Sequence, residues 1–440
     1  MKGAGRTRPW SGAVALVTVV LFVVPGVASG AVARRTELVA SSGSASSVVA
    51  EHSGERWFLG RVPRRARAAD PALTPIRIGM INQEDTPLGS YPQVRAAVEA
   101  GVAWVNAELG GVDGHPIELH TCITRFDAEQ SRTCAVQLRD AGVEAMVGGV
   151  DVTSTGSFPV IEQSGLVSIG GIPATLDEQR SADAFYFSGG DAGALAGFMA
   201  HAARHKAARV AVLYGQEVES FRVAANDYGA VVGRSLGLQV DVVPYPIFTT
   251  DFRPILEPLA ASGVDAIMVL AATTACVPVM EAAATLQPKV PLFLTGACAA
   301  DEIVEAAGSA ANGVVFNAEG PVDGANVDAA LYRDVVARYA TEPAGGAGTV
   351  GFRGFMNLYA LLREVGADRA SSPALAERAR AAVDHPSFWG HPYTCDGRQV
   401  PGMPALCAPQ QILFERLPGG GFRSVSGWIP TDRLFARASH

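Results

Sequence analysis

The stretch EAMVGGVDVTSTGSFPVIEQSGLVSIGGIPATLDE, residues Glu144–Glu178, decides the fold of this chain. It contains an apolar strand over 145–150, a polar loop, a helix over 158–163 and a second apolar strand over 166–170 that ends in another loop. Both strands are apolar enough to be buried on both faces, which is typical of parallel sheets covered by helices. Ligands of such sheets bind beyond the carboxyl ends of the strands, so these two loops predict a binding site.

Two interpretations of the loop hydroxyl groups remain open on this stretch alone. Serine and threonine hydroxyls, together with the free backbone N–H groups where the next helix begins, are suited to holding a carboxylate. The simpler interpretation is that Ser154 only caps the helix that follows it.

Strands and helices alternate along the rest of the chain, and this predicts an α/β fold with doubly wound parallel sheets. Ser90 and Gln93 have the spacing of a capping box, and Asp127 is expected to open the next helix. The other expected strands are 76–81, 117–121, 185–187, 210–214, 240–243, 266–271, 292–295 and 314–317. Helices are expected over 328–340, 352–365 and 374–383, and a hairpin over 410–416 with 422–428.

The composition restricts the partners. The chain has 440 residues, enough for about two or three domains. With 35 basic and 43 acidic residues its formal net charge is −8. This balance argues against nucleic acid and anionic membrane surfaces as partners.

The amino-terminal segment predicts export. Lys2, Arg6 and Arg8 precede the apolar run 13–24, and small residues follow it. This order predicts a signal peptide over 1–33 and an extracellular or cell-surface protein, either released by cleavage or held by an uncleaved anchor. No cysteine lies near the expected cleavage site for lipid attachment. The Ser- and Arg-rich residues 34–74 predict a flexible linker, with the folded part beginning at Thr74.

The six cysteines fall into three local pairs. An even number in an exported chain favours disulfide bonds, and none of the spacings is the C-x-x-C of zinc or redox sites. We therefore expect the bonds Cys122–Cys134, Cys276–Cys298 and Cys395–Cys407.

Catalytic motifs are weak. Residues 346–351 match G-x-G-x-x-G, but a helix and a loop precede them where a nucleotide site requires a strand. His201 and His205 are four residues apart beside Arg204 and Lys206, a pattern that favours a solvated helix face over a metal site. We expect no enzyme activity, no cofactor and no metal.

From Ile76 to about Arg423 the chain resembles the leucine/isoleucine/valine-binding protein family, the type I periplasmic solute-binding proteins of ABC importers. The resemblance rests on Ile76–Gly79, Trp104–Leu119, Asp140–Gly148 and Thr250–Phe252. The asparagine, paired glycines and G-x-P-I-E-L run between Asn106 and Leu119 are fairly specific when taken together.

This resemblance implies two lobes joined by three crossovers that close on a small-molecule ligand. The first lobe would take residues 75–189 plus 319–385, and the second 190–318 plus 386–440. The implied partner is the membrane permease of an ABC importer, and the implied state is a monomer.

The resemblance also implies ligand contacts on both lobes. The first lobe would contribute Tyr91, Val152, Thr153, Ser154, Pro173, Ala174 and Thr175. The second would contribute Glu217, Glu219, Thr273, Thr274 and Ala297. Glu84, like Glu217 and Glu219, is an acid that could hold an amine in the cleft.

Two positions depart from the family pattern. The family's amine-binding glutamate falls at or beside Ala297, and its second-lobe tyrosine falls near Thr273. A buried ammonium without a partner costs several kcal/mol. We therefore expect an amino-acid-like solute bearing a carboxylate or amide, aromatic or larger than leucine, instead of a simple aliphatic amino acid.

Three functions are compatible with these features. The first is the solute receptor of an importer, and the second is a ligand-sensing receptor domain of the same fold. The third, a secreted enzyme, would need a nucleophile with a base or a metal cluster, and the sequence offers no such motif.

Overall fold

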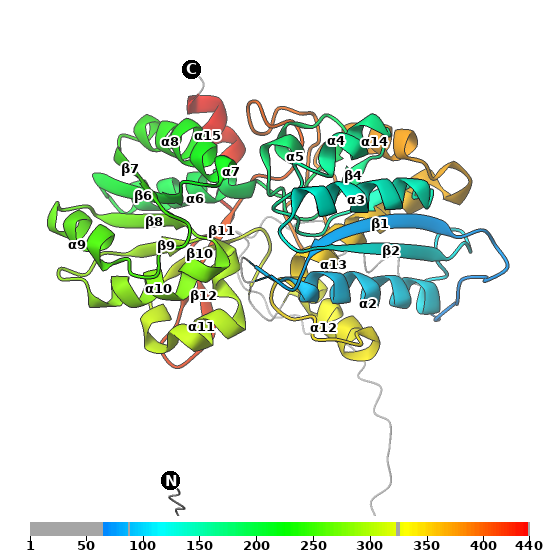
Figure 1. Cartoon of the computed structure of the whole chain (residues 1–440), viewed down its shortest axis with the longest axis horizontal. Coiled ribbons are helices and arrows are strands. Elements are labelled where there is room, and N and C mark those ends of the chain that lie inside the picture. Colours follow the sequence, from blue (N-terminus) through cyan, green and yellow to red (C-terminus); the bar gives the residue numbers. More distant parts are fainter. Residues whose placement is uncertain (1–64, 87–88, 323–325, 439–440) are drawn as a thin grey trace, which may run out of the picture. The chain divides into compact units, whose positions relative to one another are not determined.

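Five parallel strands form the first sheet, in the order β2-β1-β3-β4-β5 (Figure 1). The structure is a computed structural model and describes residues 65–86, 89–322 and 326–438. The expected strands are confirmed as β1 (Ile76–Gln83), β2 (Ile117–Thr124), β3 (Ala145–Val147), β4 (Ser168–Ile169) and β5 (Ala184–Phe185). The helices between them are α2 (Pro92–Glu108), α3 (Ala128–Asp140), α4 (Phe158–Gln163) and α5 (Leu176–Arg180).

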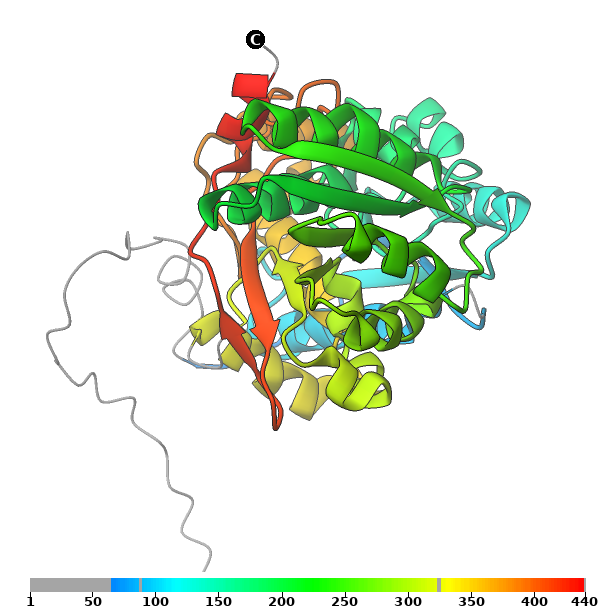
Figure 2. The same cartoon turned by 90° about the vertical axis from the view of Figure 1, so that its left-hand side faces the viewer.

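Seven strands form the second sheet, in the order β12-β11-β10-β9-β8-β6-β7. Its parallel strands are β6 (Arg209–Gly215), β7 (Gln239–Tyr245), β8 (Ala266–Leu270), β9 (Leu292–Leu294) and β10 (Val315–Ala318). The expected hairpin, β11 (Ile412–Arg416) with β12 (Phe422–Ser424), adds two antiparallel strands beside β10 (Figure 2). Its α-helices are α6 (Gly190–Arg204), α7 (Glu219–Val223), α8 (Ala230–Ser235), α9 (Arg253–Ala261), α10 (Thr273–Thr285) and α11 (Asp301–Ala307). A π-helical segment η1 (Ala224–Gly229) and the 3₁₀ turns η2 (Gly296–Ala299) and η3 (Gly308–Ala311) lie among them.

The chain passes between the two sheets at three places: after β5, after β10 and before β11. Between the last two lie the helices α12 (Val327–Tyr339), α13 (Gly348–Val365) and α14 (Ser372–Arg380), with the 3₁₀ turn η4 (Ala367–Arg369). The doubly wound α/β fold expected from the sequence is therefore confirmed. A final helix, α15 (Thr431–Ala438), had not been expected.

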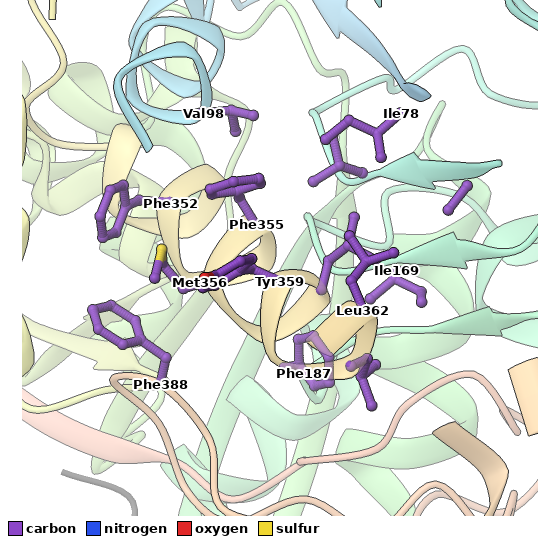
Figure 3. Close-up of a cluster of buried hydrophobic side chains, with 14 of the residues drawn as sticks. Ile78, Val98, Ile169, Phe187, Phe352, Phe355, Met356, Tyr359, Leu362 and Phe388 are labelled. Atoms are coloured by element: carbon purple, nitrogen blue, oxygen red, sulfur yellow. The ribbon is translucent and has the colours of Figure 1, made fainter. Parts of the chain in front are cut away.

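Helix α13 forms the centre of the core beneath the first sheet (Figure 3). Phe352, Phe355 and Tyr359 of this helix are fully buried or nearly so and belong to the same cluster as Ile78 of β1. Burying a large apolar side chain contributes about 1.5–3 kcal/mol. A methyl group on Gly101 of α2 would lie 2.7 Å from a ring carbon of Phe355, so this glycine permits α2 and α13 to approach closely.

The helix starts show one confirmed and one wrong prediction. Asp127 caps α3, because its side chain accepts from the backbone N–H of Gln130 at 2.9 Å. Ser90 does not cap α2. The N-cap is Tyr91, with a proline in the first turn, and the hydroxyl of Ser90 accepts from the N–H of Asp85. The Ser90 hydroxyl therefore stabilises the loop that precedes α2.

The segments at either end of the folded part add to the first core. Arg67 donates its backbone N–H to Glu108 and pairs with Leu109, so ordered contacts begin before the expected start at Thr74. Near the other end, Phe388 and Tyr393 are fully buried in the cluster that contains α13. All described residues belong to one compact unit. The expected signal peptide and most of the expected linker lie outside them, and no helix within the described part is long and apolar enough to cross a membrane.

Candidate functional site

Asp151, the first residue of the loop after β3, organises that loop from beneath. Its buried carboxylate accepts both the N–H and the hydroxyl of Thr153, at 3.0 and 2.8 Å. On its other oxygen it accepts the hydroxyl of Ser131 of α3 at 2.5 Å and that of Ser157 at 3.3 Å. Hydrogen bonds to a carboxylate are charge-assisted and strong, so they fix the conformation of the loop.

Glu178 does the same for the loop after β4. Thr175 caps α5 in a capping box with Glu178, whose carboxylate accepts the Thr175 N–H at 2.8 Å and the hydroxyl of Tyr186 at 3.0 Å. Burial raises the pKa of Glu178 to about 7 and that of Tyr186 well above its usual value. The hydroxyls of Ser154 and Thr175 lie 2.7 Å apart and join the two loops.

A small cavity of about 30 Å³ lies beneath these loops. This space is enough for about one or two water molecules and too small for a solute. Its polar lining comes from Asp151, Ser154, Ser157, Ser168, Glu178 and Tyr186. The cavity therefore supports the loops and is not itself a place for a ligand.

Glu84 is committed to a structural ion pair. Its buried carboxylate receives two hydrogen bonds from Arg95 of α2, at 2.8 and 3.1 Å, and one from Asn82 at 3.0 Å. Arg95 also contacts Glu99 and Glu342, at 3.1 and 2.8 Å. Separating Glu84 from Arg95 would leave an unpaired buried charge, which is strongly unfavourable.

Tyr91 brings the two sheets' loops together. Its hydroxyl lies 2.9 Å from the hydroxyl of Thr273, the first residue of α10 beyond β8. Burial raises the pKa of Tyr91, so its hydroxyl stays protonated at neutral pH. A second contact joins the sheets, because Ser220 of α7 donates to the carbonyl of Ala174 at 2.9 Å.

The loop after β9 is held in place by two neighbouring elements, α10 and β10. Cys298 of η2 is bonded to Cys276 of α10, and Asn317 of β10 accepts the Gly296 N–H at 2.8 Å. A methyl group on Gly296 would lie 2.5 Å from the carbonyl oxygen of Asn317. Ala297 is exposed on this fixed turn, and Thr274 is exposed on the neighbouring helix start.

The two acids after β6 have partners of their own. The carboxylate of Glu217 accepts the N–H of Ile247 at 2.8 Å, and this bond lowers its pKa. Glu219 pairs with Arg222 at 2.6 Å, which also lowers the pKa of that carboxyl. Both carboxyls are therefore ionised at neutral pH and held by these partners.

All the residues expected to contact a ligand follow the carboxyl ends of parallel strands or begin the next helix. Thr153, Val152 and Ala174 are half-buried, whereas Ser154, Pro173 and Thr175 are buried. Sequence reasoning missed the supporting residues Asp151, Glu178 and Tyr186. The T-x-x-E spacing of Thr175 and Glu178 was a detectable capping-box pattern.

Two connections between the sheets meet at a buried ion pair. Glu319, directly after β10, accepts from Arg353 of α13 at 2.5 Å and from the Gly189 N–H at 3.1 Å, with Ser188 as a further donor. Burial, together with the nearby Glu319, raises the pKa of Asp191 to about 7. The segments that leave β5 and β10 are thus tied to each other and to α13.

The remaining sequence motifs are placed as follows. All three expected disulfide pairs are joined: Cys122–Cys134, Cys276–Cys298 and Cys395–Cys407. The rings of His201 and His205 lie against each other at a tilt of 30°, with centroids 4.1 Å apart, near the end of α6. Among the described residues no group of three or more His, Cys, Asp or Glu is placed to hold a metal. The glycines of 346–351 follow α12 and open α13.

The loops at the carboxyl edge of the first parallel sheet contact those of the second sheet. Ligands of open parallel sheets bind at this edge, so the arrangement is that of a binding protein built from two such sheets. A family model described as periplasmic binding protein matches residues 75–402. The chain therefore belongs to the periplasmic binding protein family, as the resemblance implied. None of the curated proteins with which the sequence was compared is similar to it.

Solved structures have the same fold at low sequence identity. A leucine-binding protein from Thermotoga maritima has a TM-score of 0.66 and 20% identity, over 80% of this chain and 98% of that one. A fatty acid ABC transporter substrate-binding protein from Thermomonospora curvata has a TM-score of 0.68 and 16% identity, over 84% and 96%. A solute-binding protein from Rhodopseudomonas palustris, in complex with p-hydroxybenzoic acid, has a TM-score of 0.67 and 17% identity, over 83% and 100%.

Proposed function

We propose that this protein is an exported solute-binding protein, which captures a small polar solute between the loops of its two sheets and delivers it to the permease of an ABC importer. Membership in the periplasmic binding protein family supports this proposal. The observation that carries it is the 2.9 Å contact between Tyr91 and Thr273, which joins the two sets of strand-end loops. We further propose that residues 75–189 plus 319–385 form the first lobe and residues 190–318 plus 386–440 the second, and that the protein binds its solute as a monomer.

Binding at this place would act through differential contacts. A solute that touches both sets of loops stabilises the arrangement in which they are near each other, because only that arrangement offers all contacts at once. The fixed turn at Ala297 and the loops anchored by Asp151 and Glu178 are then pre-organised, so little ordering entropy is lost on binding.

The test begins with the identity of the solute. Small molecules released from the purified protein are identified by mass spectrometry, and their binding is measured by calorimetry with the variants Tyr91→Phe and Thr273→Val. Each variant is expected to weaken binding by about fivefold or more, the value of about one hydrogen bond.

The control is Thr285→Val at the far end of α10, where the hydroxyl only donates to Ala282 at 2.7 Å. It is expected to bind like the unchanged protein. Equal affinity in all three variants would place the solute elsewhere. Transport by reconstituted permease with the loaded protein would distinguish import from ligand sensing.

A further inference from the structure

The hydroxyl proton of Thr153, in the loop after β3, points toward the buried carboxylate of Asp151 beneath the loop. Thr153 donates its hydroxyl proton to Asp151 at 2.8 Å, and Ser131 and Ser157 donate to the other oxygen of the same carboxylate. A hydroxyl has one proton and two lone pairs. Once the proton of Thr153 is bound to Asp151, its oxygen can only accept a hydrogen bond from a solute.

The hydroxyl protons of Ser154 and Thr175 are also directed away from a solute. The two oxygens are 2.7 Å apart, so one of the two protons lies between them. The carboxylate of Glu178 lies 3.3 Å from the Thr175 hydroxyl and attracts the second proton. Ser154 then donates to Thr175, Thr175 donates to Glu178, and the lone pairs of Ser154 remain.

Three of the cations near these loops are paired with carboxylates. Arg95 contacts Glu84 and Glu342 at 2.8 Å and Glu99 at 3.1 Å. Arg125 contacts Asp85 at 3.3 Å, and Arg222 contacts Glu219 at 2.6 Å. Asp151 and Glu178 add two buried carboxyls directly beneath the loops.

The Tyr91–Thr273 pair, unlike the first-sheet loops, has a hydroxyl proton that it can donate. Tyr91 and Thr273 share one hydrogen bond between two hydroxyls, at 2.9 Å, so one of their two protons is left over. This pair can donate one hydrogen bond to an oxygen of a solute. A solute therefore meets acceptors on the first-sheet loops and one donor from the Tyr91–Thr273 pair.

We infer that the head group recognised by the first-sheet loops donates hydrogen bonds and carries no negative charge, as in an amide or a polyol. This inference rests on the proposed function and narrows the solutes expected from the sequence by removing those that present a carboxylate here. A carboxylate needs donors, and the side-chain donors of Thr153 and Thr175 point to Asp151 and Glu178.

The test compares solutes that differ only in the head group. Calorimetry at pH 8 uses benzoate with benzamide, 4-methylpentanoate with 4-methylpentanamide, and gluconate with sorbitol, together with any solute released from the purified protein. The uncharged member of a binding pair is expected to bind at least tenfold more tightly. A tighter carboxylate member, or a released solute held by its carboxylate alone, would overturn the inference and leave the proposed function standing. Equal affinity for the two members of a binding pair would also overturn the inference, whereas the absence of binding by every solute, the released ones included, would count against the proposed function itself.

The variant Glu178→Gln tests the cause. Its amide oxygen can still accept the Thr175 N–H and its NH₂ group can face Tyr186, but the charge that attracts the Thr175 proton is gone. Thr175 can then donate to Ser154 and free the Ser154 proton for a solute. The affinity for the carboxylate member, relative to its uncharged partner, is expected to rise by about fivefold, the value of one hydrogen bond. Glu162→Gln, at an exposed position of α4, is the matched control and is expected to leave this ratio unchanged. An unchanged ratio in Glu178→Gln would overturn the role given to Glu178.

Discussion

Replacing Glu178 with glutamine is expected to change how the stability of this protein depends on pH. Glu178 is buried, and burial raises its pKa from 4.5 to about 7. Between these two values the folded state holds a proton that the unfolded state has released. The contribution of this group to the free energy of unfolding is therefore largest below about pH 4.5, and it is lost as the pH rises through about 7.

The size of the effect follows from the shift. A difference of about 2.5 pKa units corresponds to about 3 kcal/mol, at about 1.4 kcal/mol for each unit. Glutamine is neutral at every pH. Its oxygen can still accept the Thr175 N–H, and its NH₂ group can donate to the Tyr186 oxygen where the carboxylate accepts from Tyr186. The free energy of unfolding of the variant minus that of the unchanged protein is therefore expected to rise by up to about 3 kcal/mol from about pH 4.5 to about pH 8. Any effect of the substitution that does not depend on pH shifts this difference equally at every pH.

Urea unfolding at intervals between pH 4.5 and 8 measures this difference. Other groups titrate in the same range, Asp191 with its pKa of about 7 among them, so only the difference between the two proteins is interpreted. Glu162→Gln should follow the unchanged protein at every pH, because its side chain is exposed. Parallel curves for Glu178→Gln and the unchanged protein would show that Glu178 ionises normally in the folded state, and would refute the reasoning.

Three further predictions follow from the loops and their supports. Leucine, isoleucine and valine are expected to bind no more tightly than about 100 µM by calorimetry, because a methyl group at Ala297 offers no partner for an ammonium; micromolar leucine binding would contradict this. The double variant Cys276→Ser/Cys298→Ser is expected to lose about 3 kcal/mol of unfolding free energy in urea, from a loop of 22 residues, and non-reducing peptide mapping should find these two cysteines linked in the unchanged protein. X-ray scattering is expected to show a smaller radius of gyration with saturating solute than without it, and an unchanged radius would count against closure of the two lobes.

The sequence by itself determined the features that depend on neighbours in the chain. Apolar runs of strand length, separated by helical periodicity, predicted both sheets and the exact bounds of α4. Asp127 was identified as a cap because a cap acts on the N–H three residues away. The three cysteine pairs were found because partners lie only 12 or 22 residues apart.

Only the tertiary structure decided how polar groups are paired. Glu84 is an acid that could hold an amine, but Arg95 binds its carboxylate, and Arg95 also contacts Glu342, which is 247 residues away. Tyr91 and Thr273 are 182 residues apart, so no local pattern relates them. The hydroxyls of Thr153 and Thr175 were expected to face a ligand, but the structure turns their protons toward Asp151 and Glu178. A sequence shows which groups can donate or accept, whereas the direction of each proton depends on which charged group the fold buries beside it.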